Sequence, residues 1–200
     1  TVFTEPVEIS EVRANLSELP DLTVGELTLA KDSAGNEVAA HSCYSISASC
    51  PPGMETADFE KEVQNLMKEK FAEKMPRYAM EFTLGEPQDV VLPGAAEPTT
   101  QIAVEAKLNR PMSGEVVLGY FNDAQKADDG AQNADALEVS LPQGADATAS
   151  QKEWTINVDA NDKAKVEALA QAVAAQVAEE VAFEASSSIG SSVAGYARVQ

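Results

Sequence analysis

The residues whose chemistry could best support nucleophilic catalysis are the single histidine and the two cysteines. His41 is followed two residues later by Cys43, and Cys50 follows in the same segment. A Cys–His mechanism needs a base within about 3 Å of the nucleophile, whereas successive side chains on one face of a strand stand about 6 to 7 Å apart. We therefore interpret His41 and Cys43 as an ordinary strand pair and expect no catalytic residues there.

The same three residues are too few for a zinc site. Structural zinc usually takes about four ligands in closely spaced pairs, and no fourth ligand accompanies His41, Cys43 and Cys50. Glycine-rich phosphate-binding patterns are also absent from the chain. We expect no metal site and no cofactor.

An acidic segment, residues 121–135, holds a cluster of carboxylates that invites comparison with a calcium loop. The acids are Asp123, Asp128, Asp129 and Asp135. A calcium loop places oxygen ligands at alternating positions around a central glycine and ends on glutamate, and this spacing does not fit. A solvated loop is expected. With 33 acidic residues, any carboxylate pair could be chosen as catalytic, so an enzyme using carboxylates alone is only a third hypothesis and we expect no enzyme.

The charge of the chain is strongly unbalanced, with 14 basic and 33 acidic residues and a formal net charge of −19. Such a charge repels phosphate backbones and anionic lipid and attracts basic partners, although a solvated surface or a salty habitat is the simpler explanation. The longest apolar stretch, residues 169–178, is far shorter than the roughly 20 residues of a membrane span. Direct nucleic-acid binding and membrane insertion are therefore not expected.

The compartment expected from the sequence is a reducing one. Two cysteines cannot form a disulfide framework, and the chain opens TVFTEPVEIS without a basic leader or an apolar signal core. We expect a cytoplasmic protein, or one in a virion assembled in the cytoplasm.

The first half predicts a hairpin, a helix and a returning strand. Alternating apolar residues indicate a short strand at Val7 and Ile9, a strand over 22–29 with a bulge at Gly25, and a second strand over 41–49. A helix follows from Thr56, and its apolar stripe is Phe59, Val63, Leu66, Met67, Phe71 and Met75. The returning strand spans residues 78–84.

The second half predicts four strands and another helix. The strands are expected at 102–108, 115–121, 136–141 and 153–159, with Trp154, Ile156 and Val158 on the inner face of the last. Asp159 or Asn161 caps a helix that reaches about residue 185. Its apolar stripe is Val166, Leu169, Val173, Val177 and Val181, and an extended segment is expected at 193–199.

Together these elements predict an α+β fold with mainly antiparallel sheet and two long amphipathic helices. Prolines and a glycine in 89–100 indicate a linker between an N-terminal domain, 1–88, and a C-terminal domain, 101–200. The sequence leaves open whether they pack as one domain. CYSISASC and EWTINVDA each precede a helix, so the halves are either two related hairpin-helix-strand units or unrelated.

The leading functional hypothesis is a structural, self-assembling subunit. An extended tail with unpaired backbone groups is a template for another chain, and the candidate self-association residues are Val193, Tyr196, Arg198 and Val199. We expect a homo-oligomer or a partner among other assembly subunits. The setting that we propose is the capsid of a bacteriophage or of another virus particle.

The alternative is a nucleic-acid-related binding module. It would either bind single strands or act as an acidic DNA mimic that inhibits a basic protein. The candidate contacts for the first are Lys61, Lys68, Lys70, Lys74 and Arg77. Acidic residues share this segment, so a mixed solvated face is the simpler interpretation. The sequence leaves open the partner, the stoichiometry, a viral or cellular origin, and any role for the acidic surface.

Overall fold

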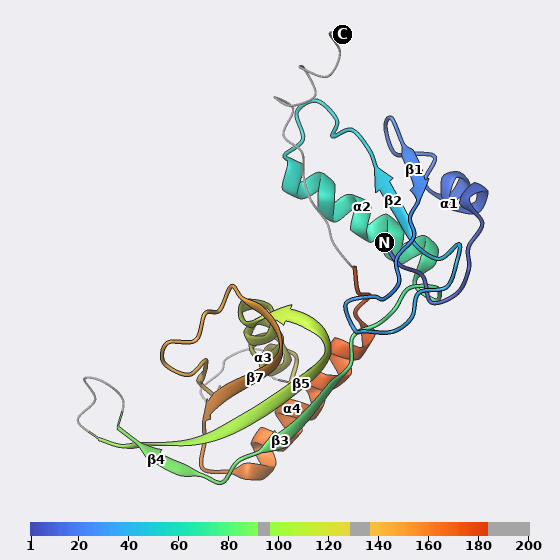
Figure 1. Cartoon of the computed structure of the whole chain (residues 1–200). Coiled ribbons are helices and arrows are strands. Elements are labelled where there is room, and N and C mark those ends of the chain that lie inside the picture. The colour runs from blue at the N-terminus through green and yellow to red at the C-terminus, as the bar shows by residue number, and fades with distance from the viewer. Residues whose placement is uncertain (92–96, 129–136, 184–200) are drawn as a thin grey trace. The chain divides into compact units, whose positions relative to one another are not determined.

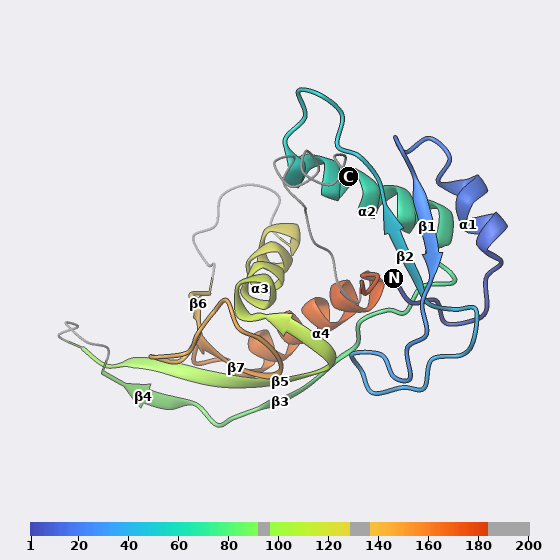
Figure 2. The same ribbon diagram turned by 45° about the horizontal axis from the view of Figure 1, so that its top comes forward.

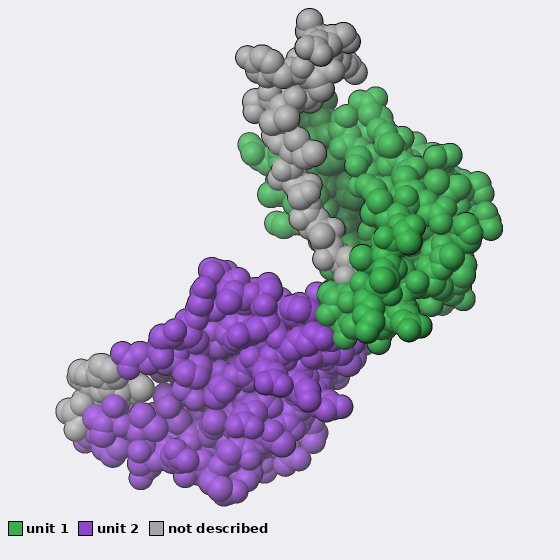
Figure 3. Space-filling view, in the orientation of Figure 1, with its two compact units in different colours: residues 1–76, 181–200 green, residues 77–180 purple. Residues whose placement is uncertain are grey.

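A computed structural model describes residues 1–91, 97–128 and 137–183 of the chain. The chain divides into two compact units, shown in Figure 3. Unit 2 comprises residues 77–180. Unit 1 comprises residues 1–76 and the segment that begins at Val181, so the chain leaves unit 1 after Pro76 and returns to it after Glu180. The predicted α+β class with antiparallel sheet is confirmed.

Unit 1 consists of a two-stranded antiparallel sheet and two helices. Its elements are α1 (Ile9–Asn15), β1 (Thr23–Glu26), β2 (Tyr44–Ser47) and α2 (Thr56–Phe71). Val24 of β1 lies opposite Ile46 of β2. Figures 1 and 2 both show α2 running beside β2.

The core of unit 1 forms between α2 and the two strands. Phe59, Met67 and Phe71 recur along one side of α2 and are buried with Val24 and Tyr44, as the apolar spacing predicts. Phe3 completes this core, since its ring centroid lies 5.2 Å from that of Phe71. The N-terminal segment is therefore part of the unit 1 core.

Two details predicted for unit 1 are wrong. The segment at Val7 and Ile9 leads into helix α1, whose Val12 is buried together with Leu16 four residues later, so the period is helical. Strands β1 and β2 pair without a bulge at Gly25. The strand is consequently shorter than predicted, and Leu27 beyond it is 50% exposed.

Unit 2 consists of a five-stranded antiparallel sheet and two helices. Its elements are β3 (Met80–Leu84), β4 (Gln88–Val90), β5 (Thr99–Ser113), α3 (Gly114–Asp128), β6 (Val139–Ser140), β7 (Ser150–Asp159) and α4 (Lys163–Glu179). The strand order is β3-β5-β7-β6, and β4 also pairs with β5.

Both helices of unit 2 cover the same face of the sheet, as Figure 2 shows. The buried side chains of the strands include Ile102, Val104, Ala106, Leu108, Trp154, Ile156 and Val158. The stripe of α4, Val166, Leu169, Val173 and Val177, is buried against them. The residues that alternate with these on β5 and β7, such as Glu105 and Thr155, are exposed. One face of the sheet is therefore core and the other is open.

The prediction of a strand at residues 115–121 is wrong, because this segment belongs to helix α3. Val117, Phe121 and Ala124 are buried at steps of four and three residues, which is the spacing of a helix. The predicted solvated loop is also helical as far as Asp128, while Asp129 and Asp135 lie outside the described residues. The strand predicted at 136–141 shortens to β6.

The two compact units divide the chain elsewhere than in the predicted linker, residues 89–100. Strands β4 and β5 on either side of this segment pair with each other, with Val90 opposite Thr99, and both belong to unit 2. The predicted returning strand, β3, also joins the sheet of unit 2. The two segments whose similarity suggested a duplication, CYSISASC and EWTINVDA, each include a strand that precedes a helix. One strand-helix pair, β2 and α2, lies in unit 1, and the other, β7 and α4, lies in unit 2.

A search of the described residues for membrane spans found no helix with the length and apolarity to cross a bilayer.

Candidate functional site

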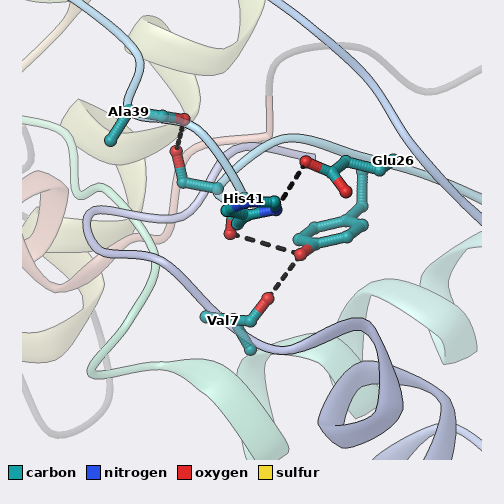
Figure 4. A network of polar contacts seen from close by, with 6 residues as sticks. Val7, Glu26, Ala39 and His41 are labelled. Atoms are coloured by element: carbon teal, nitrogen blue, oxygen red, sulfur yellow. Dashed lines mark hydrogen bonds and ion pairs between the residues drawn. The ribbon is translucent and has the colours of Figure 1, made fainter.

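His41 belongs to a polar network that holds a loop in unit 1 (Figure 4). Its backbone is in the left-handed region, with φ of 61°, and its Nδ1 lies 2.8 Å from Oε1 of Glu26. The buried Tyr44 hydroxyl donates to the carbonyl of Val7 and, at 3.2 Å, to that of His41. The Ser42 hydroxyl donates to the Ala39 carbonyl at 2.6 Å.

This network is structural in character, because every hydroxyl in it is already directed at a backbone carbonyl. Ser42 is buried and its Oγ is engaged within its own turn, so it is not presented as a nucleophile beside the exposed imidazole of His41. Burial, with the Glu26 and Glu8 carboxylates, raises the pKa of Tyr44. A neutral hydroxyl is therefore favoured as the donor that ties Val7 to the loop.

The cysteines do not form a reactive pair with this histidine. Cys43 is a buried free thiol whose backbone bridges to Val2. Cys50 is a half-buried free thiol whose Sγ lies 3.3 Å from the Met54 carbonyl oxygen. His41 is exposed while Cys43 is buried, so the structure places their side chains in different environments.

Acidic residues are not gathered into a cation site in the described part of the chain. No group of three or more His, Cys, Asp or Glu residues there could hold a metal ion. An open depression of about 350 Å³ lies at the start of α4 and is lined by Thr100, Asp159, Asp162 and Lys165 among others. The Asp162 carboxylate accepts the N–H groups of Ala164 and Lys165, so an anion would have to displace it.

The lysines proposed for nucleic acid do not line up along one face. Lys61 and Lys68 lie seven residues apart on one side of α2, whereas helical geometry puts Lys70 about half a turn away. Lys74 lies beyond the end of the helix at Phe71. Lys74 Nζ lies 2.7 Å from Glu11 Oε1, and Lys70 Nζ lies 2.8 Å from Glu69 Oε1. Hydrogen bonding to these carboxylates raises the pKa of both lysines.

Arg77 belongs to a different unit from these lysines, because it is the first residue of unit 2 whereas the lysines are in unit 1. The five candidate residues therefore form no continuous basic stripe, and two of them, Lys70 and Lys74, are paired with carboxylates.

The open face of the unit 2 sheet also lacks the features of a single-strand platform. Across β3, β5 and β7, Glu81, Lys107 and Glu153 lie in one row, and Thr83, Glu105 and Thr155 in the next. These described side chains include no aromatic ring on which a base could stack, and acids outnumber bases. The face is an acidic, hydrogen-bonding surface.

The edge of the sheet at β3 carries unpaired backbone groups. Gly85 donates its N–H to the Ala103 carbonyl at 2.8 Å, and the Ala79 carbonyl accepts from Asn109 N–H at 3.0 Å. The backbone N–H and C=O groups of the odd-numbered residues of β3 therefore point toward β5. By alternation, those of Met80, Phe82 and Leu84 point away from it. Among the residues that the structure describes, no strand pairs with that side of β3.

The opposite edge of the sheet, at β7, is partly covered. β6 pairs with Val158 and Asn157, and continuation of that register would bring Pro142 opposite Thr155. Proline has no N–H to donate, and β6 ends at Ser140. Glu153 and Thr155 therefore keep outward backbone groups that no described strand pairs.

The tail residues proposed for self-association, Val193, Tyr196, Arg198 and Val199, lie outside the described residues. The edge of β3 was missed by sequence reasoning, although the strand itself was found. No signal within residues 78–84 marks the strand as an edge, because its place in the sheet depends on pairings with distant segments.

Comparison with models of known protein families, with characterised proteins and with solved structures found no match to this chain.

Proposed function

We propose that this protein is a non-enzymatic structural subunit that assembles with copies of itself by pairing strand edges. The observation that carries the proposal is the outer edge of β3, where Met80, Phe82 and Leu84 direct N–H and C=O groups away from their own sheet. A bacteriophage or other virus particle, assembled in the cytoplasm, is the setting that we propose for this subunit.

The physical support is that a bare strand edge is a template for another strand. Monomeric proteins usually protect such edges with lysine, proline, a bulge or a covering element. β3 carries one charge, Glu81, but no lysine, proline or bulge within Met80–Leu84, and it pairs with β5 in an unbroken register. Its outward N–H and C=O groups therefore follow the regular alternation that a partner strand needs.

The charge of the chain predicts how assembly depends on salt. Each copy carries a formal charge of −19, so copies repel each other at low ionic strength. At about 0.1 M salt the screening length falls to roughly 10 Å, and repulsion weakens while backbone hydrogen bonds persist. We expect self-association to strengthen as the salt concentration rises.

The experiment is light scattering coupled to size-exclusion chromatography, across protein concentration and at low and high salt, with negative-stain imaging of the same samples. Concentration-dependent oligomers that grow with salt are expected. A strict monomer at the highest concentration and at both salt levels would overturn the proposal.

A shortened chain without residues 186–200 tests the role of the tail in the same assay. Loss of oligomers with an unchanged circular dichroism spectrum would place self-association in the tail. Retained oligomers would place it in the described strands.

The charge also favours a second candidate, the acidic mimic that occupies a basic nucleic-acid-binding cleft. Its salt dependence has the opposite sign, because attraction between unlike charges is lost on screening. Capture of a basic DNA-binding protein at low salt, with release as salt rises, would support it. The lysine arrangement on α2 gives less support to direct binding of single strands, for which a mobility shift at low salt is the test.

A further inference from the structure

We infer that β3 pairs antiparallel with β3 of a second copy of this chain, about a two-fold axis through Phe82. This inference rests on the proposed function and names the partner and geometry of its strand edge. It follows from the outward groups of β3, from the pattern of its side chains and from the contrast with β7.

The outward backbone groups set which registers are available. Met80, Phe82 and Leu84 point their N–H and C=O groups away from β5, and the N–H of Tyr78, next on this side, already donates to the Glu180 carbonyl at 3.0 Å. A partner strand therefore has free groups from Met80 to Leu84. A two-fold axis through Phe82 is the arrangement that uses all of them.

The side chains of β3 are complementary to themselves in this register. Met80 lies opposite Leu84 of the second copy, and Phe82 lies opposite its own equivalent, so apolar side chains meet on the helix side of both sheets. On the open face Glu81 lies opposite Thr83 of the second copy. A shift that centres the axis on Glu81 would instead oppose two carboxylates, which is destabilising.

Phe82 and Leu84 also have apolar surface left to cover. Both are only partly buried in their own unit, where they pack against the unit 2 core beside α4. Pairing about a perpendicular two-fold axis places the helices of both copies on the same side of one continuous sheet.

The β7 edge is less suited to the same pairing. β6 already occupies the Asn157 and Val158 end. The remaining outward residues are Gln151, Glu153 and Thr155, and pairing about Glu153 would oppose two carboxylates. Pairing about Trp154 would place Glu153 opposite Thr155, but Gln151 of the second copy would then fall opposite Asn157, where β6 already lies.

The first experiment removes one outward N–H from each edge. Leu84→Pro deletes an N–H that points away from β5, which proline at an edge strand tolerates. By symmetry the dimer loses two hydrogen bonds, so its dissociation constant should rise by about tenfold or more. Thr155→Pro makes the same change at the β7 edge and should leave the constant unchanged, while Leu84→Ala separates the lost N–H from the lost side chain.

The second experiment strengthens the interface without removing any group of the core. Thr83 and Thr155 lie on either side of Glu105, and both are exposed. In the dimer, the lysine of Thr83→Lys would lie opposite Glu81 of the other copy at two symmetric positions. The dissociation constant of the dimer should therefore fall about two- to tenfold. Thr155→Lys adds the same charge beside the same glutamate and serves as the control, so a gain confined to Thr83→Lys supports the β3 pairing.

The outcomes separate this inference from the proposed function. Oligomers that survive Leu84→Pro, respond equally to both lysine variants, or weaken only with Thr155→Pro would overturn the β3 assignment and leave assembly standing. A chain that stays monomeric in every variant and condition would overturn both. If Leu84→Pro does not fold, as judged by circular dichroism at dilute concentration, the two lysine variants decide.

Discussion

Gly114, the first residue of α3, lies directly against the indole ring of Trp154. A Cβ atom at this position would stand 2.7 Å from Cη2 of the ring and 2.8 Å from Cδ1 of Leu141. The ring is held in place because Trp154 Nε1 donates to the Met112 carbonyl at 2.9 Å in a buried hydrogen bond. The junction of β5 and α3 therefore closes only with a residue that lacks a side chain.

Gly114→Ala is expected to destabilise unit 2 by about 1–3 kcal/mol, because the new methyl group overpacks a site whose ring is fixed. Trp154 is the only tryptophan, so its fluorescence during chemical denaturation measures the change directly.

Gly119 in the same helix provides the control for this substitution. Nothing lies within 4 Å of a Cβ built there, so Gly119→Ala should stabilise by about 0.5–1 kcal/mol through helix propensity. Equal effects of the two substitutions would contradict the packing of Gly114 against Trp154.

Tyr44→Phe tests the network that ties the N-terminal segment of unit 1 to the loop at His41. Removing the hydroxyl leaves the buried Val7 carbonyl without its donor, and we expect a loss of about 1–2 kcal/mol in the free energy of unfolding. Denaturation followed by far-UV circular dichroism is the measurement. Ser45→Ala, at the exposed neighbouring position of β2, should change it by less than about 0.5 kcal/mol.

Tyr120 should make unit 2 sensitive to alkaline pH. Burial, followed by Glu180 and Tyr78, raises its pKa from 10.0 to about 12. The folded state therefore holds this proton more tightly than the unfolded state, and the stabilisation is complete below pH 10 and is lost as pH rises toward 12. After allowance for partial exposure it amounts to about 1–2 kcal/mol.

Tyr120→Phe should flatten the fall in unfolding free energy between pH 10 and pH 12, measured by Trp154 fluorescence. An alkaline slope identical to that of the parent chain would show that Tyr120 is ionised equally in both states.

The two free thiols should react at different rates with an aromatic disulfide reagent. Cys50 is half-buried, whereas Cys43 is 5% exposed and forms an isolated β-bridge with Val2. We expect a fast and a slow phase that differ by at least about tenfold, because modification of Cys43 requires local opening. Cys50→Ser should abolish the fast phase, and a remaining fast phase would place Cys43 at the surface.

Sequence patterns located the elements whose periodicity is long and unambiguous. Trp154, Ile156 and Val158 alternate strictly with polar residues, and all three are buried in β7. The stripe of α4, from Val166 to Val177, repeats over about three turns and is likewise buried. In these segments the local pattern and the tertiary packing require the same residues to face inward.

Segment 114–121 shows why α3 was misassigned. Val116, Val117 and Leu118 form an apolar run that fits a strand as well as a helix, and Gly114 and Gly119 weaken the helical signal. The structure resolves the ambiguity through tertiary contacts, because Val117 and Phe121 pack on the inner face of the sheet. Those contacts join residues far apart in the chain and leave no local signal.

The candidate interface was beyond sequence reasoning for a related reason. Whether a strand lies at an edge depends on the order β3-β5-β7-β6, which is set by pairings between distant segments. Residues 78–84 were recognised as a strand, yet nothing in them distinguishes an outer position from an inner one. Which residues of β3 point their N–H groups outward, here Met80, Phe82 and Leu84, can be deduced only once the register with β5 is known.

The return of the chain to unit 1 after Glu180 has a consequence for biosynthesis. Val181 and Ala182 are buried in unit 1, and Ala182 N–H donates to the Pro76 carbonyl at 2.7 Å. On the ribosome, the first 76 residues therefore emerge long before the side chain that completes their core, while the inserted unit 2 is synthesised without interruption. A nascent chain stopped before Val181 would leave uncovered the part of the unit 1 core that this side chain covers.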